Sequence, residues 1–422
     1  MRSSGVSRRR QGLMAATTSS SVSSRPRRAA GPGAVASIMF GVGWGANQFA
    51  SLLGLYSGRL HLGDGAAQAM FGIYALGLVP GLVLGGPASD RLGRRRIALP
   101  FASVSALVTL VLMAGASAPA LLYVGRFLAG IVTGAVLATG TAWAKELSPR
   151  SGTRLTALAV SAGFGAGPLV ASLVAQWAPD PLVTAYVPHL LIMVAAVPLA
   201  FRVRETSVRR PKPVEGRGPR LGGVGRARFW QVVAPVAIWT FTAPVTAFAV
   251  LPTRVPVRHL PIVYSGVMTA LTLAAGMAAQ PVARRLEGRH PRLVARTGLA
   301  GIISGLVAAA LTVGLEQPAL NAVAALLLGG GYGFVLNYSL TEVARMARPG
   351  ELAGLTAAAY ALVYVGMFTP LVLTRLDGLV PLDALLATLA VLASACLAYV
   401  WRRNATARPE AAERLTECSA GR

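Results

Sequence analysis

The sequence predicts an all-α integral membrane protein whose twelve transmembrane helices form two pseudo-symmetric six-helix bundles. Three observations predict this fold. Of the 422 residues, 54% are hydrophobic and only 13% are charged, whereas a soluble domain carries about 25% charged residues. The apolar residues gather in segments long enough to cross a bilayer. The basic residues fall on alternate connections between these segments.

Twelve segments have the length and polarity of a membrane-crossing helix. A bilayer core of about 30 Å needs about 20 apolar residues per helix. Backbone groups in lipid must be paired within their own segment, so we expect helix throughout. The expected spans are residues 34–57, 67–89, 97–115, 119–143, 155–176, 182–201, 230–251, 261–283, 293–314, 318–340, 353–374 and 381–401.

Arginine and lysine indicate which connections face the cytoplasm, because short cytoplasmic loops are enriched in them. One side of the predicted membrane holds both chain ends and most of the basic clusters. The other side holds only Arg59, Arg254, Arg258 and Arg375. This asymmetry predicts a multi-pass protein of a bacterial-type inner (plasma) membrane with both termini in the cytoplasm.

The connection between the sixth and seventh spans divides the chain into two halves. We expect a disordered basic cytoplasmic tail at 1–32, because this segment combines low hydrophobicity with high charge. The N-terminal bundle is predicted at 33–203 and the C-terminal bundle at 229–403. A cytoplasmic linker rich in proline and glycine is expected at 204–228, and a second cytoplasmic tail at 404–422.

Composition argues against several other classes of protein. The net charge of +25 does not predict nucleic-acid binding, because the basic residues form short clusters between apolar stretches. Cys396 and Cys418 lack the spacing of a disulfide framework or a metal site. Neither Lys145 nor Lys212 follows the glycine that a phosphate-binding loop requires. We therefore expect a monomer that is not an enzyme and has no metal, cofactor or nucleic-acid partner.

The connection after the second span carries a motif that reads Gly86-Pro-Ala-Ser-Asp90-Arg91-Leu-Gly93-Arg94-Arg95-Arg96. It resembles the signature loop of the major facilitator superfamily. The resemblance implies a conformational gate in which Asp90 approaches the start of the eleventh span, around Leu352 to Leu355, in the outward-open state. A helix N-terminus favours a nearby anion by about 0.3–1 kcal/mol. The implied gate residues are Gly86, Asp90, Arg91, Gly93, Arg94 and Arg95.

Arg126 is the only basic residue clearly inside a span. It resembles the intramembrane arginine of a second family motif, which implies a role in proton coupling. A charge at the bilayer centre costs about 2.5 kcal/mol or more, so we expect Arg126 to face the central cavity. The alternative is an arginine that snorkels to the membrane surface. Glu146 and Glu342, near span ends, are further coupling candidates, and His189 is the only histidine at membrane depth.

The fifth span carries Gly163, Gly167 and Pro168. This pattern resembles the motif of antiporters in the same superfamily, except that Ala171 and Ser172 replace its final pair of glycines. The alternative is ordinary helix packing, because small residues let any two membrane helices approach closely.

The resemblance also implies that the first, fourth, seventh and tenth spans line a central cavity. Aromatic and amide groups with few charges suit an amphipathic or mostly apolar substrate. The threonines have an alternative role, since their hydroxyls can bond to their own helix. The candidate cavity residues are Trp44, Asn47, Gln48, Thr133, Trp239, Thr242, Thr246, Tyr332, Asn337 and Tyr338.

These patterns together predict a secondary active transporter embedded in a lipid bilayer. The leading hypothesis is proton-coupled efflux of a small amphipathic or hydrophobic organic molecule by alternating access. One alternative is an uptake symporter or facilitator for a small nutrient. Another is a membrane sensor that transports nothing.

Overall fold

The computed structural model describes residues 31–206, 223–348 and 351–420. The predicted tail at 1–32 falls almost wholly outside these ranges, and so does the middle of the predicted linker. Within the described residues, eleven helices are long and apolar enough to cross a membrane. A twelfth crossing is formed by three short helices in succession near the start of the chain. The structure thus confirms an all-α membrane fold.

The first half of the chain supplies six crossings. The first combines α1 (Pro32–Asn47), the 3-10 helix η1 (Gln48–Leu52) and α2 (Leu53–Arg59). The next four are α3 (Asp64–Leu92), α4 (Arg94–Ala114), α5 (Ala120–Leu147) and α6 (Gly152–Trp177). The sixth joins α7 (Pro181–Thr184) to α8 (Val187–Phe201).

The second half repeats this arrangement. Its first crossing is assembled from α9 (Ala227–Val232), α10 (Ala234–Ala237), α11 (Trp239–Val245), the π-helix η3 (Thr246–Val250) and η4 (Leu251–Thr253). Three long helices follow: α12 (Pro261–Arg289), α13 (Pro291–Gly314) and α14 (Pro318–Met346). The eleventh crossing comprises α15 (Leu352–Val365), η5 (Gly366–Phe368) and α16 (Thr369–Leu376), and the last is α17 (Leu382–Ala420).

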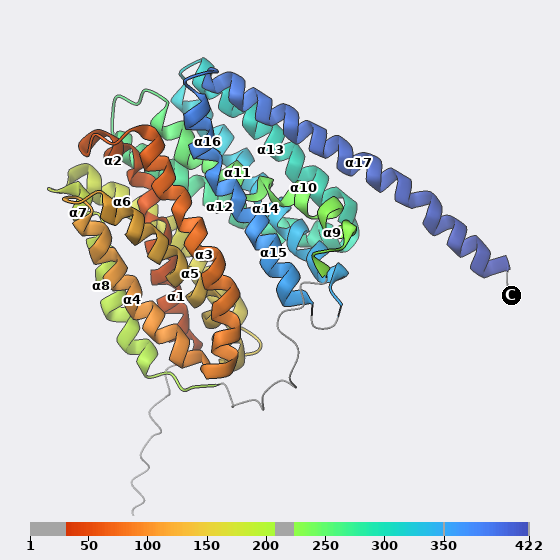
Figure 1. The fold of residues 1–422 in the computed structure, drawn as a ribbon, viewed down its shortest axis with the longest axis horizontal. Coiled ribbons are helices and arrows are strands. Elements are labelled where there is room, and N and C mark those ends of the chain that lie inside the picture. The colour runs from red at the N-terminus through yellow and green to blue at the C-terminus, as the bar shows by residue number, and fades with distance from the viewer. Residues whose placement is uncertain (1–30, 207–222, 349–350, 421–422) are drawn as a thin grey trace, which may run out of the picture.

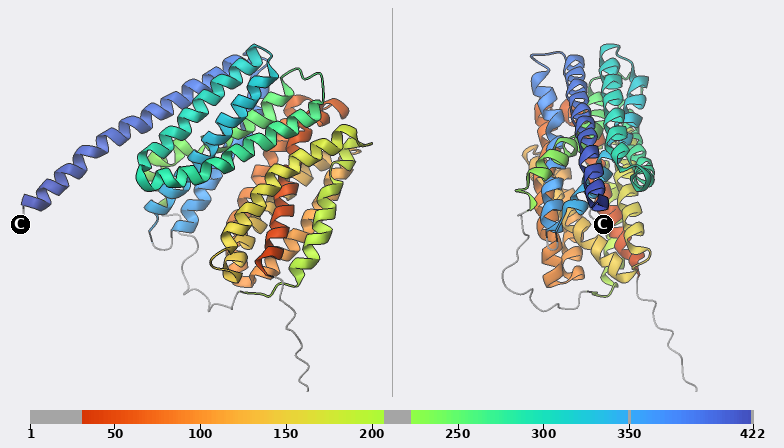
Figure 2. Two further views of the ribbon diagram at one scale, coloured as in Figure 1. Left: turned by 180° about the vertical axis from the view of Figure 1, so that it is seen from behind. Right: turned by 90° about the vertical axis from the view of Figure 1, so that its right-hand side faces the viewer.

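The two bundles lie side by side, and the end of α8 and the start of α9, which flank the linker in the sequence, lie at the same end of the pair (Figure 1). We call this the linker end; it includes the start of α1, the α3–α4 turn and the end of α14. The opposite end, which includes the α2–α3 and α16–α17 connections, is the far end. The bundles meet toward the far end and diverge toward the linker end (Figure 2).

Glycines bring α3 and α5 into direct backbone contact. A Cβ added to Gly77 would overlap the carbonyl oxygen of Phe127, and one added to Gly130 would overlap that of Tyr74. In the second half, a Cβ on Gly329 of α14 would likewise overlap a backbone carbonyl of α12. Small residues permit this close approach, which replaces the hydrophobic effect as the source of helix association in lipid.

Several predicted spans are interrupted rather than continuous. The predicted span 34–57 changes from α-helix to 3-10 helix at Gln48. In the seventh crossing, Pro244 lies two residues before the first residue of the π-helix. Proline removes a backbone donor and clashes with the preceding turn, and π-helical turns accommodate such disturbances in a helix. Helix α17 also continues well beyond the predicted span 381–401, into residues where we predicted only a tail.

Candidate functional site

Arg126 lies inside the first bundle and has no exposed surface. Its Nη1 donates a hydrogen bond to the Ala46 carbonyl oxygen at 3.0 Å. Its guanidinium carbon lies 4.6 Å from the ring centroids of both Phe49 and Tyr74, and 5.7 Å from that of Phe71. Its Nε and Nη2 have no partner. The side chain is therefore enclosed by α1, η1 and α3 and does not lie on the lipid-facing surface.

The interruption of the first crossing helps to create this site. Because α1 ends at Asn47, the Ala46 carbonyl belongs to its last turn, where a helix leaves carbonyl groups without intrahelical partners. The Arg126 side chain donates a hydrogen bond to this carbonyl. The next turn, η1, supplies the Phe49 ring that packs on the guanidinium.

Four aromatic side chains of the second half form what we call the aromatic row: Phe241, Tyr332, Tyr360 and Tyr364. Phe241 stacks on Tyr364 with ring centroids 4.9 Å apart and approaches Tyr332 at 5.8 Å. Tyr360 lies 6.1 Å from Tyr364. Tyr364 belongs to the same buried cluster as Tyr74 of the first half. The row therefore faces the rings that surround Arg126.

The two halves are closed against each other at the far end, in a contact that we call the far-end seam. The Gln68 side-chain amide donates to the Ala249 carbonyl at 3.1 Å. The Phe71 and Phe248 rings meet edge to face at 5.9 Å. Helix α6 completes the seam against α12, where the Ile262 backbone amide donates to the side chain of Gln176 at 3.2 Å.

The predicted antiporter-type motif packs α6 against both halves. A Cβ on Gly163 would overlap the Phe40 carbonyl of α1, and one on Gly167 would lie 2.6 Å from the Trp44 carbonyl. Pro168 and Ser172, further along α6, face Gly266 of α12 across the seam.

At the linker end, the predicted gate loop is organised by Glu205. Gly93 ends α3 with φ at +114°, a value that favours glycine. The Glu205 carboxylate accepts hydrogen bonds from the Arg94 and Arg95 backbone amides at 2.8 and 3.0 Å. A carboxylate at the first turn of α4 is well placed, because helix N-termini favour anions.

The charged side chains of this loop pair with one another. Arg94 contacts Glu146 of α5 at 3.0 Å and Asp90 at 2.5 Å. The carboxylate of Asp90 remains largely exposed. Arg91 is also exposed, and Gly86 lies on the last turns of α3, where its carbonyl accepts a bond from Ser89. In this conformation, with the far end closed, Asp90 thus pairs within its own loop.

The second half holds a comparable cluster at its linker end. Arg345 bonds Glu342 at 2.9 Å, and its other terminal nitrogen lies 2.7 Å from Glu287 of α12. The sequence identified Glu342 but missed Glu287, whose place next to Arg284 and Arg285 was the available signal. Glu146 and Arg126 share α5 but are separated by roughly 30 Å along its axis, at about 1.5 Å per residue. The three predicted coupling residues do not come together.

The predicted cavity threonines bond to their own helices. Thr133 donates to the Ala129 carbonyl at 2.7 Å, and Thr246 to that of Thr242 at 2.7 Å. Thr242 donates to Ile238 at 2.9 Å and receives a longer bond from Thr369 at 3.2 Å. These three positions therefore show the local bonding that the sequence left open as an alternative.

The aromatic and amide candidates are dispersed. Trp239 and Tyr338 pack in the core of the second bundle, whereas Tyr332 joins the aromatic row. Gln48 is fully buried with no partner for its amide atoms. Asn47 is half-buried beside it, and the indole nitrogen of Trp44 has no partner.

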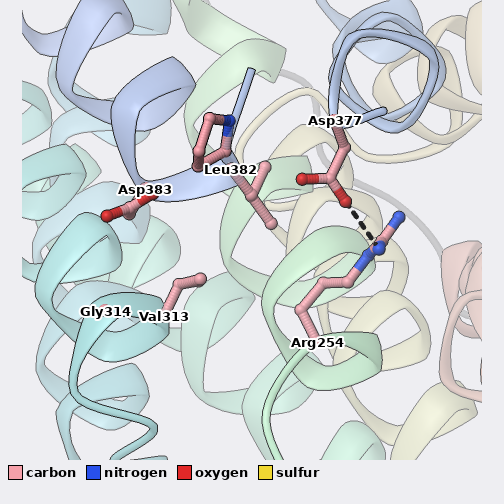
Figure 3. A pocket seen from close by; sticks show the side chains of 7 residues that line it. Arg254, Val313, Gly314, Asp377, Leu382 and Asp383 are labelled. Atoms are coloured by element: carbon pink, nitrogen blue, oxygen red, sulfur yellow. Dashed lines mark hydrogen bonds and ion pairs between the residues drawn. The ribbon is translucent and has the colours of Figure 1, made fainter. Parts of the chain in front are cut away.

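Two pockets lie within the second bundle, apart from Arg126. One, of about 340 Å³, lies between α12 and α14 toward the linker end and includes Asn337 and Gln280. The other, of about 360 Å³, lies at the far end (Figure 3). Its wall contains an ion pair of 2.7 Å between Arg254 and Asp377, which ties the seventh crossing to the eleventh.

His189 is separate from Arg126 as well. It is buried between α8 and its neighbours, with Nδ1 2.7 Å from the Thr109 hydroxyl. A Cβ on Gly45 of α1 would lie 2.6 Å from its Nε2. His189 therefore packs within the first bundle.

Comparisons with known proteins are consistent with this architecture. The family model described as Major Facilitator Superfamily matches residues 33–370. A mutant of the nucleoside transporter NupG is similar in structure, with a TM-score of 0.71, 10% identity, and coverage of 88% of this chain and 98% of that one. A POT family transporter in complex with 5-aminolevulinic acid gives 0.71, 11% identity, and 89% and 95% coverage.

A POT family transporter in complex with a thioalcohol-conjugated peptide is also similar, with a TM-score of 0.71, 10% identity, and coverage of 90% of this chain and 96% of that one. Among curated proteins, no match to the chain was found. At these identities the structural likeness supports the shared fold and not a shared substrate.

Proposed function

Because this chain belongs to the major facilitator superfamily, and is therefore a membrane transporter, we propose that it exports a small amphipathic or hydrophobic organic molecule in exchange for protons. The observation that carries the proposal is the aromatic site between the halves. The aromatic row faces the rings around Arg126, and no Asp or Glu lies in the middle of a span. Such a site suits a largely apolar molecule that is not a permanent cation.

The packing of α6 supports export over uptake. Gly163 and Gly167 hold α6 against the α1 backbone, and the next turn reaches α12 across the seam. Rocking of the two bundles about the central site would then exchange its exposure from one side to the other.

We place the linker end in the cytoplasm of the plasma membrane, with the protein as a monomer. The excess of arginine at this end supports the orientation. On this assignment the described conformation is closed to the outside. In the opposite conformation Asp90 would leave Arg94 and approach the start of α15. A reporter fused to the C-terminus should be active only inside the cell.

Proton coupling is assigned to Arg126, Glu146 and Glu342. Both carboxylates lie at the linker end, where each shares an arginine with a second acid. Protonation of Glu146 would remove its attraction to Arg94 and leave that arginine to Asp90. Binding of a proton would thereby alter the same loop that is proposed to gate the halves.

Inverted membrane vesicles provide the test. Respiration acidifies their interior, so an exporter should concentrate the neutral dye N-phenyl-1-naphthylamine inside them, and nigericin should abolish the accumulation. Vesicles without the protein are the control. Dye movement in the same direction as protons would instead support an uptake symporter.

The main alternative is uptake of a small nutrient, since the similar structures include a nucleoside transporter and POT family transporters. Proteoliposomes loaded at one pH and diluted into another can test it with a labelled nucleoside and a labelled dipeptide. Uptake of either driven by inward proton flow would replace the export proposal.

A further inference from the structure

Arg126 is a buried cation that has no acidic side chain beside it. It contacts one backbone carbonyl and the rings of Phe49, Phe71 and Tyr74. The hydroxyl-bearing side chains of Tyr56 and Tyr186, which bond to each other, also lie near it. The acidic side chains that the structure describes pair or lie at the ends of the crossings, as Glu146 and Glu342 do. Aromatic faces and a carbonyl offset only part of the cost of removing a charge from water, which normally requires a counter-charge.

The free atoms of Arg126 form one edge of the guanidinium. Nη1 is occupied by the Ala46 carbonyl, whereas Nε and Nη2 have no partner. The N–H bonds of Nε and Nη2 are parallel, and such a pair matches the two oxygens of a carboxylate. The edge of the arginine that recognises a planar anion most specifically is thus buried without a hydrogen-bond partner.

The surroundings indicate what the anion would be attached to. Phe71 and Tyr74 border the guanidinium on the first half. Across the boundary, Phe248 contacts Phe71, and Tyr364 of the aromatic row lies in the same cluster as Tyr74. A flat apolar body next to the acid group would find aromatic faces on both halves.

We propose that Arg126 binds the carboxylate of an aromatic acid through Nε and Nη2, with the rings of the two halves enclosing its apolar part. The inference rests on the proposed transport function and specifies that its amphipathic substrates include aromatic monoanions. Because Phe71 and Tyr74 meet the second half in the closed conformation, the site becomes accessible when the far-end seam opens. A chloride ion could occupy the same edge, since it shares the negative charge.

Binding to the purified full-length protein in detergent tests the proposal without any ion gradient. The probes are 1-naphthoate and its uncharged analogue 1-naphthamide, which share a ring system and differ in charge. We expect at least tenfold tighter binding of the naphthoate by tryptophan fluorescence. Equal affinity of the two probes for the unmodified protein would overturn the proposal without reference to any variant.

Three variants assign the preference to a residue. Arg126→Gln should make the two probes bind equally, and Arg126→Lys, which keeps the charge but not the parallel donors, should lose most of the preference. Arg296→Gln is the matched control, because Arg296 also lies over an aromatic ring, that of Trp401, at 5.5 Å. A preference that survives in both Arg126 variants would refute the assignment.

Adding chloride to a buffer of low ionic strength, with an equal osmolarity of sucrose as the reference, distinguishes the two sources of the anion. Competition of chloride with naphthoate at millimolar concentration, lost in Arg126→Gln, would identify an inorganic anion as an occupant of the same edge. Indifference to chloride would assign the edge to organic acids. Because these measurements need no transport, they can fail while dye export succeeds, and the reverse.

Discussion

Substitution of Gly266 by alanine should open the far-end seam. A Cβ at this position of α12 would overlap the Ser172 hydroxyl, lie 2.5 Å from the Ser172 Cβ and lie 2.9 Å from the Pro168 carbonyl oxygen. Overpacking of this kind costs about 1–3 kcal/mol. The clash exists only while the halves are closed, so the cost shifts the conformational equilibrium toward the open form by about 5- to 150-fold.

Labelling of a buried seam residue measures this shift. Ala249 is fully buried and its carbonyl accepts the bond from Gln68. In a protein with Cys396 and Cys418 changed to serine, Ala249→Cys should react with a water-soluble maleimide at a rate proportional to the open population. Gly266→Ala should raise that rate by the factor above.

A second substitution makes the test specific for this contact. Ser172→Gly removes the hydroxyl and the Cβ that Gly266→Ala would strike, so the double variant should return most of the way to the original rate. Gly165→Ala on α6, the helix that carries Ser172, is the control, because a Cβ there meets nothing within 4 Å. An unchanged labelling rate in Gly266→Ala, or a failure of Ser172→Gly to lower it, would refute the reasoning.

Three further substitutions probe other parts of the structure. Gly93→Ala places a side chain at a strained φ and against the Glu205 carboxylate, which should cost about 1–3 kcal/mol and lower the thermal unfolding midpoint in detergent. Phe241→Leu removes a ring of the aromatic row that we propose contacts the substrate; loss of a ring–dye contact worth about 0.5–1.5 kcal/mol should weaken binding of N-phenyl-1-naphthylamine by up to about tenfold, measured by fluorescence titration. Asp377→Asn breaks an ion pair whose two side chains are each 23% exposed and should change stability by at most about 1 kcal/mol, which the same melting assay would show as little or no shift.

Hydropathy and charge alone predicted the all-α membrane fold. The bilayer requires each crossing to contain about 20 consecutive apolar residues, so the sequence shows such a segment at every crossing. Interruptions such as the turn at Gln48 were not predicted, because a hydropathy window is insensitive to hydrogen-bond register. The closed far end also could not be predicted, since one sequence must encode both conformations of a transporter.

The candidate site was predictable only in part. Arg126 was identified because a charge in an apolar segment is energetically costly and is therefore usually functional. Phe241 and Tyr364 were not identified, because an aromatic side chain in a membrane span is equally stable facing lipid or buried between helices. Thr133 has the opposite problem: its hydroxyl bonds to its own helix, and sequence spacing does not distinguish that bond from one to a ligand.

The contact of α3 with α5 bears on how the transport specificity of this chain can change. Gly77 and Gly130 leave no room for even a methyl group. These positions therefore do not tolerate substitution, and they keep α3 and α5 packed as one rigid unit. The aromatic row, by contrast, is built from side chains that can be exchanged singly. A directed-evolution library for new cargo would vary Tyr332 and Tyr360 and leave the glycines untouched.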